Sequence, residues 1–374
     1  MKKFYLFAVA LTVATSVLAV EEGKDVKQQY PNCKVTGWIK VTYQDTIYKD
    51  TNKIYPSGFE VKDAGVVISG EAWTNIGYSL YLQGNRASKV NDKEETPLAS
   101  GESVLSTRLV GAYIDWKIAK AANIRMGQFK KPMGMEQWTS PVNYDFINVS
   151  QLTKNFISNT YDQGIMFFGK KEQLSYWLSL FNGSLYDYKD KNTAKNTIAK
   201  VVYVPMAGLT TGGSLEYGTQ NLTGKSLYSR RVGVEVNWEW RKLMVRSEYM
   251  IGSDDKALSS DSVMVDTAWI KRSGTDANLM RSTYLTVGCL PLPNLRVMAR
   301  ADMYRQNYKW DLATDGSNVW WDKSESRVMT YTLGTDYSLN SNAKVFLNYE
   351  IRQEDLALRP VKNNVLMAQF QAKF

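Results

Sequence analysis

The sequence of 374 residues contains no histidine. A Ser-His-Asp triad, a Cys-His pair and a histidine-ligated metal site therefore cannot form in this chain. The absence excludes hydrolases and proteases that depend on histidine, and no other cluster of side chains selects a reaction. We predict that the protein is not an enzyme, and we assign it no catalytic residue, no metal ligand and no cofactor.

Cysteine is almost as scarce, since the chain has only Cys33 and Cys289. They lie far apart in the sequence, and neither belongs to a spacing that is typical of metal sites. In an oxidising compartment they could form a disulfide, and they could equally remain two free buried thiols. The sequence leaves both possibilities open.

Long hydrophobic runs are missing apart from one near the N-terminus, which extends from Phe4 to about Leu18. Lys2 and Lys3 precede this run and small residues follow it, so we predict a secretory signal peptide that is cleaved after Ala19. An uncleaved membrane anchor is the weaker alternative, because the run is short and is interrupted by hydroxyl residues. The mature chain is therefore expected to be exported.

No other run approaches the ~18 apolar residues that a membrane helix needs. This excludes transmembrane helices but not a membrane-inserted β-barrel, whose strands need only ~10 alternating residues. No internal repeat, low-complexity tract or linker divides the rest of the chain. We therefore predict a signal peptide over residues 1–19, a short N-terminal segment over 20–34 and a single domain over 35–374.

Alternation of apolar and polar residues is the dominant pattern of that domain. In "RVGVEVNWEW", for example, Val232 and Val234 lie on one face of a strand, and Arg231 and Glu235 lie on the other. Such alternation is typical of strands whose two faces meet different surroundings. It occurs in sixteen segments: 35–43, 65–70, 76–82, 110–116, 124–129, 163–168, 174–181, 198–204, 212–217, 231–240, 243–251, 279–287, 295–304, 329–337, 344–352 and 366–374.

Three further features favour a membrane barrel over a secreted β-sandwich or β-helix. Tight turns alternate with long polar insertions, as expected for short periplasmic turns and long outer loops. The chain also ends on an alternating strand that carries Phe370 and Phe374, like the terminus that the barrel assembly machinery reads. Finally, aromatic residues recur near strand ends, where interfacial girdles are expected: Trp38, Trp116, Tyr176, Trp238, Trp240, Tyr249, Tyr331, Tyr337 and Tyr349.

These observations predict an all-β fold, an antiparallel transmembrane β-barrel of sixteen strands in the outer membrane of a Gram-negative bacterium. Outer-membrane lipid and the barrel assembly machinery are the partners that such a barrel requires. Phe370 and Phe374 are the candidate assembly signal. We expect no nucleic-acid partner.

Basic residues outnumber acidic ones on the face that would line the pore. The chain has a net charge of +9. On the alternating strand positions that would face the lumen, we count eleven basic and six acidic residues. A positive potential between low-dielectric walls would concentrate anions, whereas partial pairing of the charges would leave a weakly selective channel. The two sets are Lys40, Lys117, Arg125, Arg231, Lys242, Arg246, Arg296, Arg300, Lys344, Arg352 and Lys373, and Asp115, Glu235, Glu239, Glu248, Asp302 and Glu350.

One stretch, "IRMGQFKKPMGMEQ", resembles the G-Q-F-K-x-P-F-G-x-E segment of the phosphate-selective porin family, porins O and P. Met133 stands where phenylalanine is usual, and the matching residues are Gly127, Gln128, Phe129, Lys130, Pro132, Gly134 and Glu136. "YDQGIMFFGK" is similar to the family's R-D-x-G-[IV] strand, with Tyr161 in place of the arginine. The resemblance extends from about Val61 to Lys170 and includes the terminal strand.

The resemblance implies a sixteen-stranded barrel that assembles as a homotrimer. It also implies an inward-folded loop that narrows the channel, and an arginine ladder that leads to a lysine cluster selective for phosphate or polyphosphate. From strand parity alone, Arg231, Arg246, Arg296 and Arg300 are the candidates for the ladder.

The same stretch predicts where a loop leaves the barrel wall. Arg125 and Phe129 share the lumen parity, and Pro132 cannot donate a hydrogen bond to a sheet. Lys130 and Lys131 therefore lie where the departing loop could carry them into the pore as a cationic constriction. Alternatively, both lysines extend to solvent at the rim of the barrel.

Together, the residues and the resemblance predict a passive outer-membrane porin for small hydrophilic solutes. A preference for small anions such as phosphate or polyphosphate would arise from Arg125, Lys130, Lys131, Arg231, Arg246, Arg296 and Arg300. The alternatives are a weakly selective general porin, and a surface adhesin or structural barrel with an occluded lumen.

Overall fold

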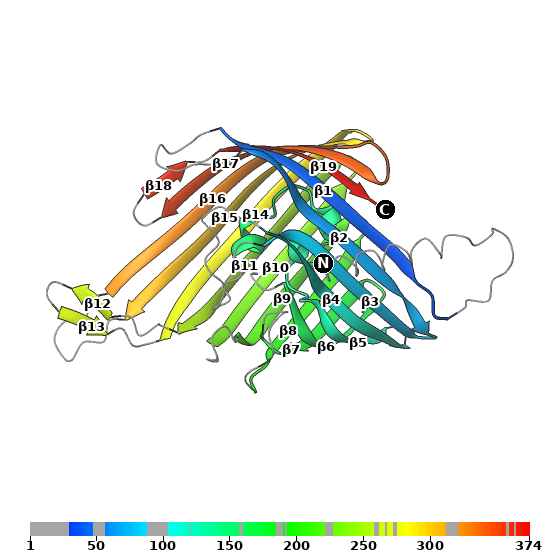
Figure 1. Ribbon diagram of the computed structural model, residues 1–374, viewed down its shortest axis with the longest axis horizontal. Helices are drawn as coiled ribbons and strands as arrows, with labels where there is room; N and C mark the ends of the chain where they lie inside the picture. The colour runs from blue at the N-terminus through cyan, green and yellow to red at the C-terminus, as the bar shows by residue number, and fades with distance from the viewer. Residues whose placement is uncertain are drawn as a thin grey trace.

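The computed structural model forms one closed barrel of antiparallel strands (Figure 1). It describes residues 30–47, 57–87, 104–119, 121–156, 160–184, 190, 193–220, 227–257, 262–265, 268–271, 275–311, 321–356, 359–362 and 364–374. The predicted signal peptide, residues 1–19, and most of the segment 20–34 lie outside these ranges, so both stay predictions.

Sixteen long strands build the wall, and each pairs with the next along the chain until β19 pairs with β1 and closes the barrel. The short β18 (Arg359–Lys362) adds to β17, and the pair β12 (Ser262–Val265) and β13 (Ala268–Lys271) forms a separate hairpin. The long strands are β1 (Lys34–Thr46), β2 (Gly58–Trp73), β3 (Ile76–Ala87), β4 (Val104–Ala119), β5 (Ala122–Lys130), β6 (Tyr161–Lys171), β7 (Leu174–Phe181), β8 (Asn196–Met206), β9 (Leu209–Gln220), β10 (Leu227–Trp240), β11 (Leu243–Ala257), β14 (Thr275–Leu292), β15 (Leu295–Asp311), β16 (Trp321–Ser338), β17 (Ala343–Leu356) and β19 (Val365–Lys373).

Each of these strands contains one of the sixteen alternating segments, so the predicted fold class and strand number are confirmed. The alternation sorts side chains between membrane and lumen. On β1, Ile39 and Val41 are exposed on the outer surface, whereas Lys40 and Thr42 are buried inside the barrel. Trp38 departs from the predicted girdle because it is 6 % exposed, faces inward and packs against Gly65.

The two ends of the barrel differ in the length of their connections. The β2–β3, β6–β7 and β10–β11 turns are tight, and each contains a non-glycine residue with positive φ: Asn75, Glu172 and Arg241. The chain ends at this rim, where the Gly37 amide donates to the Phe374 carbonyl at 2.8 Å. Short turns mark the periplasmic end of such barrels, so the long connections lie at the outer end.

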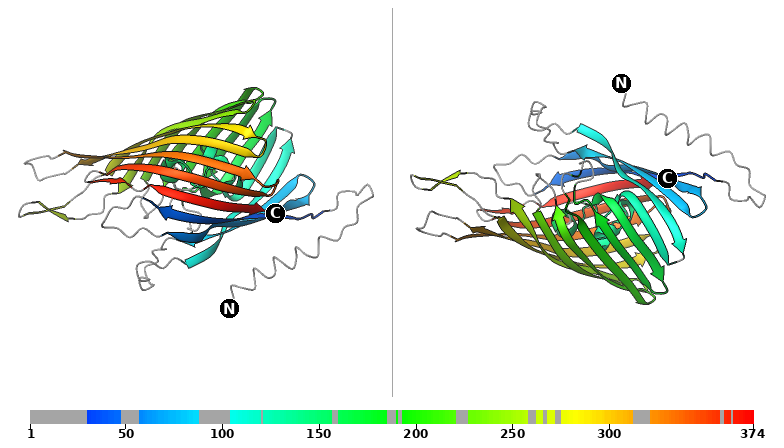
Figure 2. Two further views of the ribbon diagram at one scale, coloured as in Figure 1. Left: turned by 90° about the horizontal axis from the view of Figure 1, so that it is seen from above. Right: turned by 90° about the horizontal axis from the view of Figure 1, so that it is seen from below.

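The connection between β5 and β6, residues 131–160, turns back into the barrel, and we call it the inward-folded loop. It contains α2 (Met135–Trp138) and the short helical turns η1 (Pro141–Asn143) and η2 (Leu152–Phe156). Helical turns of this loop are visible among the barrel strands in two further views (Figure 2). The loop that the resemblance implied is therefore present.

Cys33 and Cys289 are free thiols rather than a disulfide. Cys33 is exposed near the start of β1, and Cys289 lies near the end of β14. Among the described residues, no helix is long and apolar enough to cross a membrane.

Candidate functional site

The inward-folded loop begins where β5 leaves the wall, and the motif residues explain how it does so. Gly127 has φ 129°, and a Cβ there would lie 2.3 Å from the Ala112 carbonyl oxygen, so the position requires glycine. Two residues before it, Arg125 faces the lumen and pairs with Asp115, its Nε 2.7 Å from Oδ1. After Lys130, the ladder to β6 ends with a hydrogen bond from the Lys131 amide to the Thr160 carbonyl.

Lys130 and Lys131 both make contacts that fix the first residues of the inward-folded loop. Lys131 is 2 % exposed, and its Nζ lies 3.8 Å from both Asp162 of the adjacent strand β6 and Glu216 of β9. Lys130 is half-buried, and its Nζ donates to the Thr139 carbonyl at 2.8 Å. Both ammonium groups thus bind within the protein, and their effect on anion passage stays a prediction.

The first half of the loop is fastened to β8 and β11. Glu248 of β11 is buried, and its carboxylate accepts hydrogen bonds from the amides of Met135 and Glu136 at 2.7 and 2.6 Å. Lys200 of β8 donates to the Gly134 carbonyl at 2.8 Å and pairs with Glu235 at 2.5 Å. Charged side chains therefore hold the backbone of the loop directly.

The middle of the loop places one carboxylate between two wall arginines. Asp145 lies 2.6 Å from Arg246 Nη1 and 3.0 Å from Arg296 Nη1. Its neighbour Phe146 packs beneath Arg300, whose guanidinium carbon is 4.7 Å from the ring centroid. Earlier in the loop, burial raises the pKa of the Tyr144 phenol well above its ordinary value, so this side chain stays neutral.

The second half of the loop is tied to the first half by Glu136. One carboxylate oxygen accepts from the Ser150 amide, the Ser150 hydroxyl and the Thr153 hydroxyl at 2.8, 2.6 and 2.7 Å. The other oxygen lies 3.2 Å from Nη1 of Arg300, which also pairs with Asp302 at 3.0 Å. The family motif ends on this glutamate, and its hydrogen bonds hold the two halves of the loop together.

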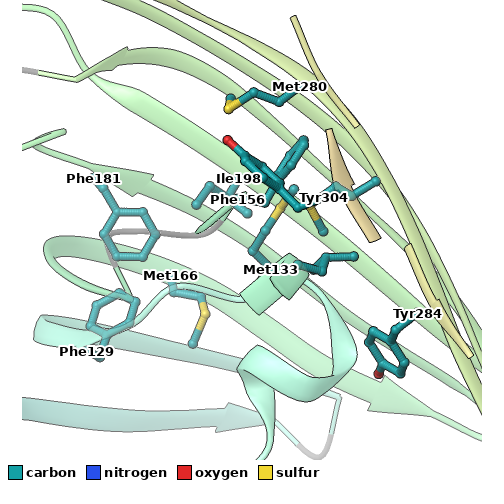
Figure 3. Packing of buried hydrophobic residues seen from close by; sticks show 11 residues of the cluster. Phe129, Met133, Phe156, Met166, Phe181, Ile198, Met280, Tyr284 and Tyr304 are labelled. Carbon is teal, nitrogen blue, oxygen red and sulfur yellow. The ribbon is translucent and has the colours of Figure 1, made fainter. Parts of the chain in front are cut away.

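A hydrophobic cluster fills the space between the loop and the wall of β5–β8, β11, β14 and β15. Figure 3 shows Phe156 of the loop beside Met280 and Tyr304 of the wall, with Met133 nearby. Met133, which replaces the usual phenylalanine of the motif, is fully buried. The cluster consists of Phe129, Met133, Leu152, Phe156, Met166, Phe181, Ile198, Met250, Met280, Tyr284 and Tyr304. Sequence reasoning missed it because apolar residues on the lumen parity of a barrel carry no local signal.

One cavity, which we call the outer cavity, lies beside the second half of the loop and has a volume of about 190 Å³. Its wall residues Gln44 and Arg352 lie past Thr42 and Glu350 toward the outer ends of β1 and β17. Its lining includes three cations and one carboxylate among Gln44, Asn148, Val149, Gln151, Lys154, Arg300, Thr330, Glu350 and Arg352.

The cations of the outer cavity retain hydrogen-bonding capacity. A guanidinium has five N–H donors, and Arg352 directs two of its nitrogens, Nε and Nη2, to Glu350 at 2.9 and 2.5 Å. Lys154 is exposed, and its ammonium has no carboxylate within 4.0 Å in the described part of the chain. A second, larger cavity lies on the periplasmic side of the loop.

The predicted pore residues therefore separate into several places. Arg246 and Arg296 meet at Asp145, and Arg300 lines the outer cavity. Arg231 lies elsewhere, buried between Glu216 and Asp254, and Arg125 pairs with Asp115. The structure thus brings three of them to the loop, while their part in anion binding stays a prediction. Lys154 was missed because it lies outside any alternating segment.

The assembly-signal candidates lie on the membrane side of β19. Phe370 and Phe374 are 48 % and 63 % exposed, and Phe374 closes the barrel by its backbone bonds to Gly37. Their recognition by the assembly machinery stays a prediction.

A closed barrel of sixteen antiparallel strands with a loop folded into its lumen defines an outer-membrane porin, a channel rather than an enzyme. The chain belongs to the family "Phosphate-selective porin O and P", whose sequence model matches residues 33–274. The predicted resemblance is confirmed, and family and fold together place the protein in the outer membrane of a Gram-negative bacterium. No curated protein sequence matches the chain.

Several solved porins share the fold at low sequence identity. The outer membrane channel DcaP of Acinetobacter baumannii aligns with a TM-score of 0.62 at 12 % identity, over 92 % of this chain and 97 % of that one. An anion-selective porin from Comamonas acidovorans aligns with a TM-score of 0.62 at 10 % identity, over 92 % and 99 %. The trimer form of OmpT from Vibrio cholerae aligns with a TM-score of 0.60 at 9 % identity, again over 92 % and 99 %.

Proposed function

We propose that this porin passes small hydrophilic solutes passively and prefers anions such as phosphate or polyphosphate. The single observation that carries the proposal is the outer cavity, where Lys154, Arg300 and Arg352 line about 190 Å³ together with one carboxylate. Amide and hydroxyl groups complete the lining, so an oxyanion there would meet cations and neutral hydrogen-bonding groups. The family description and the anion-selective neighbour support the same preference.

The geometry also limits how strongly charge can act elsewhere in the lumen. Arg125, Arg231, Arg246 and Arg296 each have a carboxylate within 3.0 Å, which reduces the positive potential that a mobile anion would meet. Arg300 and Arg352 of the outer cavity are paired as closely, so the outer cavity differs by Lys154, which forms no ion pair with the described residues. The preference should therefore come from a short region rather than from the whole pore. Conduction needs sites that bind weakly enough to release the ion, and a partly paired arginine suits that requirement.

Planar-bilayer recordings test the proposal directly. We expect the reversal potential in a KCl gradient to lie on the anion side, and added phosphate to reduce the chloride current. The double variant Arg352→Gln with Lys154→Gln should weaken the phosphate block about tenfold, which corresponds to about 1.4 kcal/mol. The control Lys117→Gln removes a cation whose side chain is 53 % exposed at the periplasmic end, and it should change neither property. Cation preference without phosphate block would refute the proposal.

A barrel with an occluded lumen is the second candidate, because the loop reaches the wall on opposite sides. Its contacts include Lys200 of β8 and Glu248 of β11, and also Lys40 of β1, which donates to the Pro141 carbonyl at 2.6 Å. Liposome swelling separates the two candidates. Small sugars should enter liposomes that contain the porin, whereas an occluded adhesin or anchor would admit none.

We also infer that the barrel assembles as a homotrimer. The trimer form of the OmpT neighbour and the family resemblance support this assembly. Chemical cross-linking of the protein in membranes should then yield a three-subunit band, and a monomer band alone would contradict it.

A further inference from the structure

The second cavity, which we call the inner cavity, lies on the periplasmic side of the inward-folded loop and has a volume of about 370 Å³. Its wall residues Val202, Asn237 and Thr286 lie past Lys200, Glu235 and Tyr284 toward the short turns. The volume falls within the ~300–1,000 Å³ typical of small-molecule sites.

Aromatic side chains dominate the apolar part of the inner cavity. Trp138 of α2 and Trp177 of β7 meet edge to face, with ring centroids 5.9 Å apart, and both line the cavity. Tyr144, Phe146 and Tyr284 complete the aromatic lining. Neither indole N–H donates a hydrogen bond within the described part of the chain, although tryptophan normally finds a partner when it is buried. The lining therefore offers flat apolar faces together with unused donors.

Arg246 supplies a polar anchor at the same cavity. Its side chain is 24 % exposed, and it makes three hydrogen bonds, from Nε to Asn237, from Nη1 to Asp145 and from Nη2 to Glu239. A guanidinium has five N–H donors in a planar fork, so two remain. Such a group matches the geometry of a carboxylate.

The carboxylates around the inner cavity are already engaged. Glu235 pairs with Lys200 at 2.5 Å, and Asp145 pairs with Arg246 and Arg296. Glu136, the third carboxylate of the lining, pairs with Arg300. The lining thus holds three carboxylates and two cations, Lys200 and Arg246, and each carboxylate lies within 3.2 Å of at least one cation.

We propose that the inner cavity binds a small aromatic solute that carries a carboxylate group. The ring lies against Trp138 and Trp177, and the carboxylate accepts hydrogen bonds from Arg246. This assignment rests on the proposed function, because the solute is an anion that enters the channel. It adds a substrate class, aromatic carboxylates, that the lining of the outer cavity does not specify. A cavity with aromatic walls distinguishes benzoate from acetate because the ring adds apolar contact area.

Isothermal titration calorimetry on the full-length barrel in detergent tests the assignment. The probes are benzoate, acetate, benzyl alcohol and benzylamine, which separate the ring from the charge and the sign of the charge. Benzoate should bind at least tenfold more tightly than each of the other three. Equal binding of benzoate and acetate would refute the aromatic contact, and tighter binding of benzylamine would show that the acids of the lining dominate.

Variants locate the site within the barrel. Trp177→Ser should weaken benzoate binding at least fivefold, and Trp177→Phe should restore most of it because a ring remains. Arg246→Gln should weaken benzoate but leave benzyl alcohol unchanged. The control Trp116→Ser removes a tryptophan that is 55 % exposed on the outer surface, and it should have no effect. Folding of each variant is checked by the shift of the unheated band in SDS gels.

The two proposals can fail separately. If benzoate and acetate bind equally while the KCl reversal potential lies on the anion side, the aromatic site is refuted and the anion preference stands. If benzoate binding depends on Trp177 but the reversal potential lies on the cation side, the site stands and the proposed ion preference is refuted.

Discussion

Replacing Glu136 by alanine removes the carboxylate that joins the two halves of the inward-folded loop. The wild-type side chain accepts three hydrogen bonds, from the Ser150 amide and hydroxyl and from the Thr153 hydroxyl, and it pairs with Arg300 at 3.2 Å. Other anchors remain in the variant, such as Asp145 between its two arginines. The loop should therefore stay inside the barrel but fluctuate more.

The size of the effect follows from the number of lost bonds. A hydrogen bond to a charged group contributes about 1.5–3 kcal/mol, and bonds that share one carboxylate do not add fully. We therefore expect Glu136→Ala to destabilise the closed form of the loop by about 3 kcal/mol, roughly a hundredfold in its population relative to loosened forms. The variant also removes one negative charge beside Arg300, so anion preference should increase.

Single-channel recordings measure both consequences. We expect larger open-channel current noise, a higher mean conductance, and a reversal potential shifted further to the anion side. Glu136→Gln separates the two causes, because it removes the charge and keeps an oxygen that can accept from Ser150. This variant should shift the reversal potential with a smaller increase in noise.

Glu239→Ala is the matched control for Glu136→Ala. Glu239 also pairs with an arginine, Arg246, at 2.8 Å, but its side chain is 52 % exposed. Exposed pairs contribute about 0–1 kcal/mol, so loop noise should stay near that of the wild type. If Glu136→Ala matches the wild type in noise, conductance and reversal potential, the carboxylate does not hold the loop and the reasoning is wrong.

Two further predictions concern the charge of the lumen and the end of the chain. Asp145→Asn removes the negative charge that two wall arginines share at 2.6 and 3.0 Å, so the KCl reversal potential should shift toward anions; an unchanged potential would place this pair outside the ion path. Phe374→Ala should lower the amount of folded barrel in the outer-membrane fraction while refolding into detergent stays near normal. Equal losses in both assays would indicate a role in stability rather than in assembly.

The strands could be predicted from the sequence because each one carries its own signal. Ile39 and Val41 face lipid, and Lys40 and Thr42 face the lumen, which the nine-residue stretch around them already indicates. Period-two alternation needs no knowledge of the partner strand. All sixteen segments consequently correspond to strands of the barrel.

The contacts of the inward-folded loop could be predicted only in part from the local sequence. Pro132 predicts that the chain leaves the wall, because proline cannot donate to a sheet. The partners of the loop are remote, however: the Glu136 amide donates to Glu248, which lies 112 residues away. Lys131 likewise looks like a free cation in the sequence, whereas its ammonium pairs with Asp162 of the adjacent strand β6 and with Glu216 of β9. The alternation along a strand shows whether a side chain faces the membrane or the lumen, but it does not show which residues that side chain contacts.

The count of lumen charges was incomplete for the same reason. Parity identified Arg231, Arg246 and Arg296, but several of their acidic partners lie in the loop or near strand ends, outside the alternating segments. Asp145, which engages two arginines, precedes the buried Phe146 in a stretch without period-two alternation. Most of the cations that appear in excess in the sequence therefore form ion pairs in the folded barrel. The anion preference of the pore then depends on the cations whose N–H groups are not all engaged within the protein.

The ion pair between Glu136 and Arg300 links the two cavities. Arg300 lines the outer cavity and Glu136 lines the inner cavity, and the two side chains meet at 3.2 Å. A solute held in the outer cavity would therefore lie next to the guanidinium that pairs with a carboxylate of the inner cavity. An anion that engaged Arg300 would compete with Glu136 for the same donors and would weaken the bond between the halves of the loop. Phosphate should then raise the open-channel noise of the wild type toward that of Glu136→Ala, and it should leave the noise of Glu136→Ala itself almost unchanged.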